Sequence, residues 1–456
     1  MPQRHPDSLT AARRMGGEAL AILALGGPLV AHNLANMGMQ FADTVMAGRL
    51  APRDLAAVAV GANIWVALIV LVLGILMALS PTVAHLYGAG RRSEIGHYTR
   101  QGFWLSQLLA WSGFAFIRHL APLMHRLGVD PAVVPLTDAY LDAISWGLPA
   151  MSAYLVLRFT SEGVSHTRPM LFISSAGMLL NILANWVLMY GHWGFPRLGA
   201  AGCGYASAFV MWFMAGLFAW YVAWRKYYRA YGIFERFELP HPGTQLEILR
   251  LGVPIGVSVF MEASLFSATG LLMATLGADV VAGHQIAVNW GAMMFMVPMG
   301  LAMAISVRVG QALGRGDPAG ARFSSWVGVV MCGGFMLVSA AVMLSVPGLI
   351  ASLYTHNPAV HGMAVSLLGM AAIFQLSDGL QVSAAGALRG YKDTRVPMLI
   401  TIVAYWLVGF PLAWWLGVQA GLGPRAVWSG LIGGLTCAAV LLGVRLARTT
   451  RRAARS

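Results

Sequence analysis

Residues 55–79 read LAAVAVGANIWVALIVLVLGILMAL and contain no Asp, Glu, Lys or Arg. A helix needs about 20 mostly apolar residues to cross the hydrocarbon core of a bilayer, and this stretch is long enough. Over the whole chain 58% of the residues are hydrophobic and 10% are charged, with a mean hydropathy of +0.68. Soluble domains carry about 25% charged residues, so residues 55–79 predict a membrane span in a chain made mostly of such spans.

Further apolar stretches of the same length recur along the chain. They predict an all-α, polytopic membrane protein with spans that begin near residues 20, 54, 98, 138, 168, 201, 249, 280, 324, 360, 396 and 427. We expect the polar residues 1–19 to form a cytoplasmic lead and the basic residues 447–456 a cytoplasmic tail.

The basic residues fix the expected orientation. With both termini placed in the cytoplasm, only six of the 30 Lys and Arg residues fall outside, namely Arg49, Arg53, Arg118, Arg126, Arg197 and Arg425. Short cytoplasmic loops of membrane proteins carry such an excess. The net charge of +13 is therefore explained by topology in a bacterial inner membrane, and no nucleic-acid partner is expected.

The two halves of the chain repeat each other. When the chain is slid along itself so that Leu25-Gly-Gly-Pro28 falls on Leu251-Gly-Val-Pro254, the same shift places Ser80 on Ser306. Six helices return a chain to its starting side, so the repeat is parallel and predicts two six-helix lobes around a central cavity. The predicted domains are the lead 1–19, a first lobe 20–224, a linker 225–248, a second lobe 249–446 and the tail 447–456.

Three acidic residues, Asp43, Glu262 and Asp378, lie inside apolar runs. A charge at the centre of a bilayer costs about 2.5–3.5 kcal/mol on insertion scales, so we expect these side chains to face a cavity. There each could bind a proton, a metal ion or a cationic drug. The alternative is that they join helices by hydrogen bonds, as polar residues in membranes do.

Amide side chains accompany these acids at helical spacing. Residues seven positions apart, such as Asn36 and Asp43, share a helix face, and Asn181 and Asn185 can point at one spot together with Asp43. Carboxylate and amide oxygens suit a hard cation, although paired amides also join helices. The supporting polar residues predicted for the two lobes are Asn36, Gln375, Gln381 and Asn289.

Pro28 and Pro254 each interrupt the hydrogen bonding of an apolar helix. Either could act as a hinge, although kinks are common in membrane helices. The chain has no Walker A sequence, so the energy for any transport is expected from an ion gradient. We predict no cofactor and no enzymatic activity.

Two stretches resemble the multidrug and toxic compound extrusion (MATE) family, in its NorM branch. They are residues 41–57, which include Asp43, and residues 282–289, Ala-Gly-His-Gln-Ile-Ala-Val-Asn. The resemblance extends over essentially the whole chain. It implies two six-helix lobes and export of cationic amphiphilic drugs coupled to sodium or protons.

Position by position, the family resemblance also assigns the site residues. Glu262 and Asp378 match the family's second-lobe cation acids, and Asp43, Asn181 and Asn185 match its first-lobe polar cluster. Phe374, one turn before Asp378, offers no oxygen ligand, which leaves the choice between sodium and protons open.

These features predict an antiporter that acts as a monomer. A cation bound at Glu262 and Asp378, with sodium as the candidate metal, favours one lobe arrangement and displaces a cationic drug outward. The alternative is a flippase of a lipid-linked saccharide or peptidoglycan precursor, for which a cavity rich in Arg would be expected. A membrane-embedded enzyme would need a catalytic cluster on its loops, and the short external loops offer little room.

Overall fold

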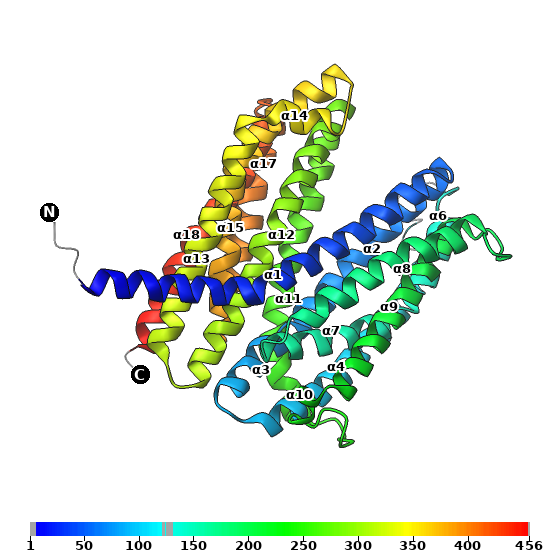
Figure 1. Ribbon diagram of the computed structural model, residues 1–456. Coiled ribbons are helices and arrows are strands. Elements are labelled where there is room, and N and C mark those ends of the chain that lie inside the picture. The colour runs from blue at the N-terminus through cyan, green and yellow to red at the C-terminus, as the bar shows by residue number, and fades with distance from the viewer. Residues whose placement is uncertain (1–5, 121–123, 125–130, 455–456) are drawn as a thin grey trace. The chain divides into compact units, whose positions relative to one another are not determined.

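The computed structural model describes residues 6–120, 124 and 131–454, with side chains described from residue 13 onward (Figure 1). All regular elements in these ranges are helices. Three parts of the predictions lie outside the described residues: residues 1–5 of the lead, Arg126 among the external basic residues, and residues 455–456 of the tail.

The chain divides into two compact units, and two helices contribute residues to both. The shared helices are α1 (Pro6–Gly48) and α11 (Pro242–Ala274). The unit formed by residues 31–256 also contains α2 (Pro52–Leu76), α3 (Leu79–Gly88), α4 (Arg92–Ile117), α6 (Val134–Ser145), α7 (Leu148–Gly163), α8 (Arg168–Tyr190), α9 (Gly199–Trp224) and α10 (Lys226–Arg229).

The other unit comprises residues 1–30 and 257–456. Its remaining helices are α12 (Ala278–Gly314), α13 (Pro318–Ser345), α14 (Pro347–Ser352), α15 (Pro358–Gly390), α16 (Arg395–Ile402), the π-helix η1 (Val403–Gly409), α17 (Phe410–Trp414), the π-helix η2 (Trp415–Gln419) and α18 (Pro424–Ala453). Proline begins several of these helices because its missing N–H is not needed in the first turn. The Asn357 side chain caps α15 by accepting from the Ala359 amide at 3.0 Å.

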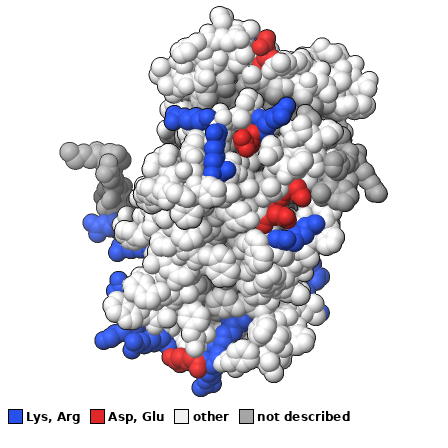
Figure 2. Space-filling view, turned by 90° about the vertical axis from the view of Figure 1, so that its right-hand side faces the viewer, with Lys and Arg blue, Asp and Glu red and all other residues white. Residues whose placement is uncertain are grey.

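Ten segments of the described chain are long and apolar enough to cross a membrane. The third predicted span corresponds to α4, and the fourth corresponds to α6 and α7 together. Neither is among the ten segments that are long and apolar enough to cross a membrane. Helix α4 includes Glu94 and Arg100, and the fourth span is broken around Trp146 into two shorter helices. Figure 2 shows one face of the molecule, on which charged side chains are few and separated by wide uncharged surface.

The boundary between the units falls inside α1 and α11, after Val30 and after Gly256. The predicted lobes instead begin at residues 20 and 249, so the two divisions differ for residues 20–30 and 249–256. The first half of α1 groups with the second lobe because Ile22 is fully buried in that unit's core. Hydrogen bonds from Arg308 Nη2 (2.5 Å) and Ser324 Oγ (2.6 Å) to Glu18 fix it further.

The internal repeat is visible in the packing of equivalent glycines. A Cβ atom on Gly163 would lie 2.8 Å from the carbonyl oxygen of Ser80, and one on Gly390 would lie 2.8 Å from that of Ser306. Ser80 and Ser306 are the pair that the sequence repeat aligns. Both lobes therefore contain the same close helix contact, which leaves no room for a side chain.

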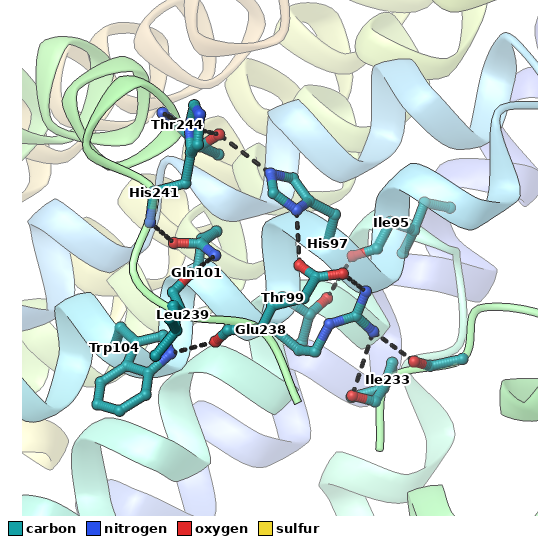
Figure 3. Close-up of polar contacts among 12 residues, drawn as sticks. Ile95, His97, Thr99, Gln101, Trp104, Ile233, Glu238, Leu239, His241 and Thr244 are labelled. Carbon is teal, nitrogen blue, oxygen red and sulfur yellow. Dashed lines mark hydrogen bonds and ion pairs between the residues drawn. The ribbon is translucent and has the colours of Figure 1, made fainter. Parts of the chain in front are cut away.

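The linker expected at residues 225–248 is partly helical, because α10 lies within it and α11 already begins at Pro242. Its middle part is attached to α4 by polar contacts (Figure 3). The Glu238 carboxylate accepts from Arg100 Nη2 at 2.5 Å and lies 2.7 Å from His97 Nδ1. The Glu238 carbonyl accepts from Trp104 Nε1 at 2.8 Å, and the Gln101 side chain donates to the Leu239 carbonyl at 2.9 Å.

Candidate functional site

Glu262 and Asp378 come together in the unit that contains residues 257–456. Glu262 lies on α11 and is half-buried, whereas Asp378 lies on α15 and is 5% exposed. The Gln381 side-chain nitrogen donates to both carboxylates, at 3.2 Å to Glu262 Oε1 and 3.4 Å to Asp378 Oδ1. Because one amide group bridges them, the two acids form a single site.

A cavity of about 120 Å³ opens beside this acid pair. A water molecule occupies about 30 Å³ in the liquid, so the cavity has room for an ion with a few waters. Its lining residues are Glu262, Phe266, Ala287, Val288, Gly291, Ala292, Phe295, Ala371, Phe374, Gln375, Asp378 and Trp428.

The Gln375 amide is oriented by two neighbours. Ser339 Oγ donates to Gln375 Oε1 at 2.6 Å, and Gln375 Nε2 donates to the Gly291 carbonyl at 3.5 Å. Ser339 was not predicted from the sequence, because a single serine in an apolar helix is not distinctive. The third predicted polar residue of this lobe, Asn289 on α12, is half-buried and lies outside the set of residues that lines the cavity.

Aromatic rings form the apolar part of the cavity wall. Phe374 meets Phe266 and Trp428 edge to face, with ring centroids 5.8 and 5.6 Å apart. Phe374 therefore lines the cavity with an apolar ring and offers no oxygen ligand to a cation. The side-chain oxygens at this cavity are the carboxylates of Glu262 and Asp378 and the amide oxygen of Gln375, which accepts from Ser339. Hard oxygen donors of this kind suit a hard cation.

Asp43, Asn181 and Asn185 form a second polar cluster, in the unit of residues 31–256. Asn185 Nδ2 donates to Asp43 Oδ1 at 2.5 Å and to Asn181 Oδ1 at 3.2 Å. Asn181 and Asn185 are one turn apart on α8, and the short contact brings α8 to α1. The structure thus assembles the three side chains at one spot, as the i, i+4 spacing predicted.

Two residues of α9 complete this first-lobe cluster. Ser207 and Cys203 lie close to the Asp43 carboxylate, and the sequence had not linked them to it. Cys203 is a buried free cysteine. Asn36 points elsewhere, because its Nδ2 lies 2.9 Å from His32 Nε2 one turn earlier on α1.

Pro28 and Pro254 lie inside the continuous helices α1 and α11. Each stands shortly before the point where its helix passes from one compact unit to the other, at Val30 and Gly256. A proline lacks the amide hydrogen needed to bond the carbonyl four residues earlier. The helices are therefore weakened close to the boundary between the units.

Comparison with known proteins identifies relatives along the whole chain. The family model described as MatE matches twice, over residues 28–187 and 254–415, so the two matches begin at the equivalent prolines Pro28 and Pro254. The multidrug resistance protein PmpM of Pseudomonas aeruginosa is 44% identical over 450 residues, covering 97% of this chain and 94% of its own length. The multidrug resistance protein MdtK of Photorhabdus laumondii is 40% identical over 440 residues, covering 95% and 96%.

Solved structures have the same fold. An outward-facing multidrug resistance MATE family transporter of the MOP superfamily superimposes with a TM-score of 0.89 at 19% identity, covering 96% of this chain and 97% of that one. The eukaryotic MATE transporter AtDTX14 gives a TM-score of 0.88, also at 19% identity, covering 96% and 98%. Together with the doubled family match and the two relatives that align along almost the whole chain, these findings show that this chain belongs to the MATE family of membrane transporters.

Proposed function

We propose that this chain is a multidrug exporter of a bacterial inner membrane that moves cationic or amphiphilic drugs outward in exchange for sodium ions or protons. The observation that carries the proposal is the convergence of Glu262 and Asp378 on one small cavity. The names of two relatives, which are multidrug resistance proteins, support a drug as the transported substrate. Their names give no support to a lipid flippase.

The small size of the cavity and its two carboxylates support a coupling ion as its occupant. Two carboxylates taken out of water attract a cation strongly, and a cavity of about 120 Å³ admits a small ion. The drug is proposed to bind at another place in the protein. Ion and drug would then compete through the conformation of the protein, since each binds one state better than the other.

Pro28 and Pro254 are the proposed hinges of that change of conformation. Both stand close to the points where α1 and α11 pass from one compact unit to the other, so bending there would alter each unit little. The positive-inside pattern supports cytoplasmic placement of both termini. We further propose that the chain works as a monomer, without nucleic acid or a bound cofactor.

The test uses purified protein in vesicles, with a sodium gradient or a pH gradient imposed separately. Ethidium export should follow one of the two gradients and should be lost in Glu262→Gln and in Asp378→Asn. Glu94→Gln is the matched control, because Glu94 is a partly exposed partner of Arg91 at the start of α4. Full ethidium export by both acid variants, at normal expression, would contradict the proposal.

A further inference from the structure

The first parts of α1 and α11 are exchanged between the two compact units. Helix α1 passes from the unit that holds most of the second lobe into the other unit after Val30, and α11 passes in the opposite direction after Gly256. The shift that places Leu25 on Leu251 also places Val30 on Gly256. Each half of the chain therefore begins its first helix in the unit of the other half, and both helices change units at the same position of the repeat.

A carboxylate fixes the first part of α1 in its unit. Arg308 of α12 donates to Glu18 through Nε at 3.0 Å and Nη2 at 2.5 Å, and Ser324 of α13 donates to Glu18 Oε1 at 2.6 Å. Hydrogen bonds to charged groups are among the stronger ones in proteins. Glu18 thus holds α1 to two helices of the second lobe.

A carboxylate fixes the first part of α11 in the same way. The Tyr98 hydroxyl of α4 donates to Glu247 Oε2 at 2.6 Å. One turn earlier on α11, Thr244 Oγ1 lies 3.0 Å from Nε2 of His97 (Figure 3). Glu247 and Thr244 thus hold α11 to a helix of the first lobe.

The hydrogen bonds of Glu18 and Glu247 form two anchors that are equivalent in the repeat. The same shift places Tyr98 on Ser324 and Thr244 on Glu18. The hydroxyl groups of Tyr98 and Ser324 each donate at 2.6 Å to a carboxylate of the exchanged helix. The carboxylates stand one turn apart in the aligned helices, so the two halves build the same kind of anchor from acids at neighbouring positions.

Close packing continues from the anchors toward the boundary between the units. A Cβ atom on Gly26 of α1 would lie 2.9 Å from the Leu301 side chain on α12, and one on Gly252 of α11 would overlap the Ile75 carbonyl oxygen on α2. The repeat aligns Gly26 with Gly252 and Ile75 with Leu301. Both exchanged segments therefore pack on the equivalent helix of the opposite half.

A second matched pair of contacts stands at the boundary itself. A Cβ atom on Gly300 of α12 would lie 2.9 Å from the Val30 amide nitrogen, and one on Gly74 of α2 would overlap the Gly256 backbone. The repeat aligns Gly74 with Gly300. Each exchanged segment is thus held on the opposite half up to the residue at which its helix changes units.

The anchors add what the close packing does not supply. Helices in a bilayer associate through van der Waals packing and hydrogen bonds, without a hydrophobic driving force. A surface of small residues lets two backbones approach but offers little resistance to sliding along the helix axis. The hydrogen bonds of Glu18 and Glu247 oppose such sliding, so each anchored segment moves with the unit that holds it.

We propose that Glu18 and Glu247 are positioning residues of the transport cycle, which keep the starts of α1 and α11 attached to the opposite lobes in every state. A change in the relative position of the units then has to bend both helices at the boundary, near Pro28 and Pro254. This role rests on the proposed function. It differs from that of a gate, whose contacts break and form again in each cycle.

The experiment replaces the anchor of α1 by a covalent link that can be removed. Glu18→Cys/Ser324→Cys loses the hydrogen bonds of Glu18, and a short bis-methanethiosulfonate reagent joins the two thiols until a reductant cleaves the link. At saturating coupling cation, ethidium export from vesicles by the untreated variant should fall about tenfold, the factor for one hydrogen bond to a charged group. Crosslinking should restore export, and the reductant should abolish the gain.

Glu247→Cys/Tyr98→Cys applies the same test to α11 and keeps the proposal testable if the first variant fails to fold. Glu235→Gln should export as the unmutated protein does, because Glu235 is an exposed carboxylate of the linker. The unmutated protein treated with the reagent controls for reaction at the native thiols of Cys203, Cys332 and Cys437.

Three results would overturn the role of the anchors. Crosslinks that block export, with recovery in reductant, would show that the anchors open during the cycle. Full export by both untreated variants would show that the anchors are not needed, and slow export that crosslinking leaves slow would indicate a general packing defect. If the unmutated protein itself shows no cation-dependent export, the proposed function fails, and that failure is distinguishable because it needs no variant.

Discussion

Glu238→Gln is expected to release the linker from α4. The substitution keeps the size of the side chain but removes the charge that Arg100 Nη2 and His97 Nδ1 contact at 2.5 and 2.7 Å. The contacts made by the backbone carbonyl of Glu238 and by Gln101 stay in place (Figure 3). The variant therefore tests the charged part of the attachment alone.

The burial of the pair sets the magnitude of the effect. The side chains of Arg100 and Glu238 are 11% and 29% exposed, so the pair is neither a free surface contact nor a dry one. Exposed ion pairs contribute about 0.2–1 kcal/mol, and hydrogen bonds to charged groups about 1.5–3 kcal/mol. We expect a loss of about 2 kcal/mol, which corresponds to roughly 30-fold more frequent detachment.

Hydrogen exchange of the linker amides measures this detachment. The His241 amide donates to Gln101 Oε1 at 2.7 Å and is protected while the linker is attached, so its exchange should accelerate roughly 30-fold in Glu238→Gln. Glu235→Gln is the matched control, because Glu235 is an exposed carboxylate of the same loop. Equal exchange in the unmutated protein and both variants would refute the role of the charge.

The pH dependence of the attachment has a definite sign. The pKa of Glu238 is lowered from its ordinary value, chiefly by the hydrogen bond from Arg100. A carboxyl whose pKa is lowered by folding contributes stability above its unfolded pKa and loses it as the pH falls through the lowered value. Protection of His241 in the unmutated protein should therefore fall in acid, and this part of the fall should be missing in Glu238→Gln.

Two further substitutions test the packing and the first-lobe cluster. Asn185→Ala removes the closest donor to Asp43 and should lower ethidium export about tenfold, measured in vesicles at matched protein content; unchanged export would exclude a role for this contact. Gly390→Ala places a Cβ 2.8 Å from the Ser306 carbonyl oxygen and should destabilise the protein by about 1–3 kcal/mol, seen as a lower melting temperature in detergent. The control Gly369→Ala meets no atom within 4 Å, and equal melting of the two variants would contradict the packing argument.

The sequence predicted most of the fold because membrane spans depend on local composition. Apolar length places each helix, and the constant shift that aligns Leu25 with Leu251 marks the halves as repeats. It did not predict the break around Trp146 or the passage of α1 between two units. The break has a local signal in Gly147 and Pro149, at the start of α7, whereas the passage of α1 depends on tertiary packing, which no local pattern records.

The candidate sites were predicted as far as charge allows. A carboxylate in an apolar run is conspicuous because of its cost, so Glu262 and Asp378 stood out. Two other residues of that site, Ser339 and Trp428, did not stand out, since they resemble many other residues of apolar helices. Asn36 shows the limit of helix-face arguments, because its amide bonds His32 on its own helix instead of joining Asp43.

The matching glycine contacts at Gly163 and Gly390 have an evolutionary consequence. After the duplication of an ancestral half, a backbone contact that excludes every side chain leaves no neutral route for change, so both descendants retain it. Polar side chains on the same helices carry no such restriction: Glu262 corresponds to Asn36, and Asp43 to Thr269. The packing contact stayed fixed while the polar residues of the two halves diverged. A protein with two identical halves could thus acquire two chemically different lobes.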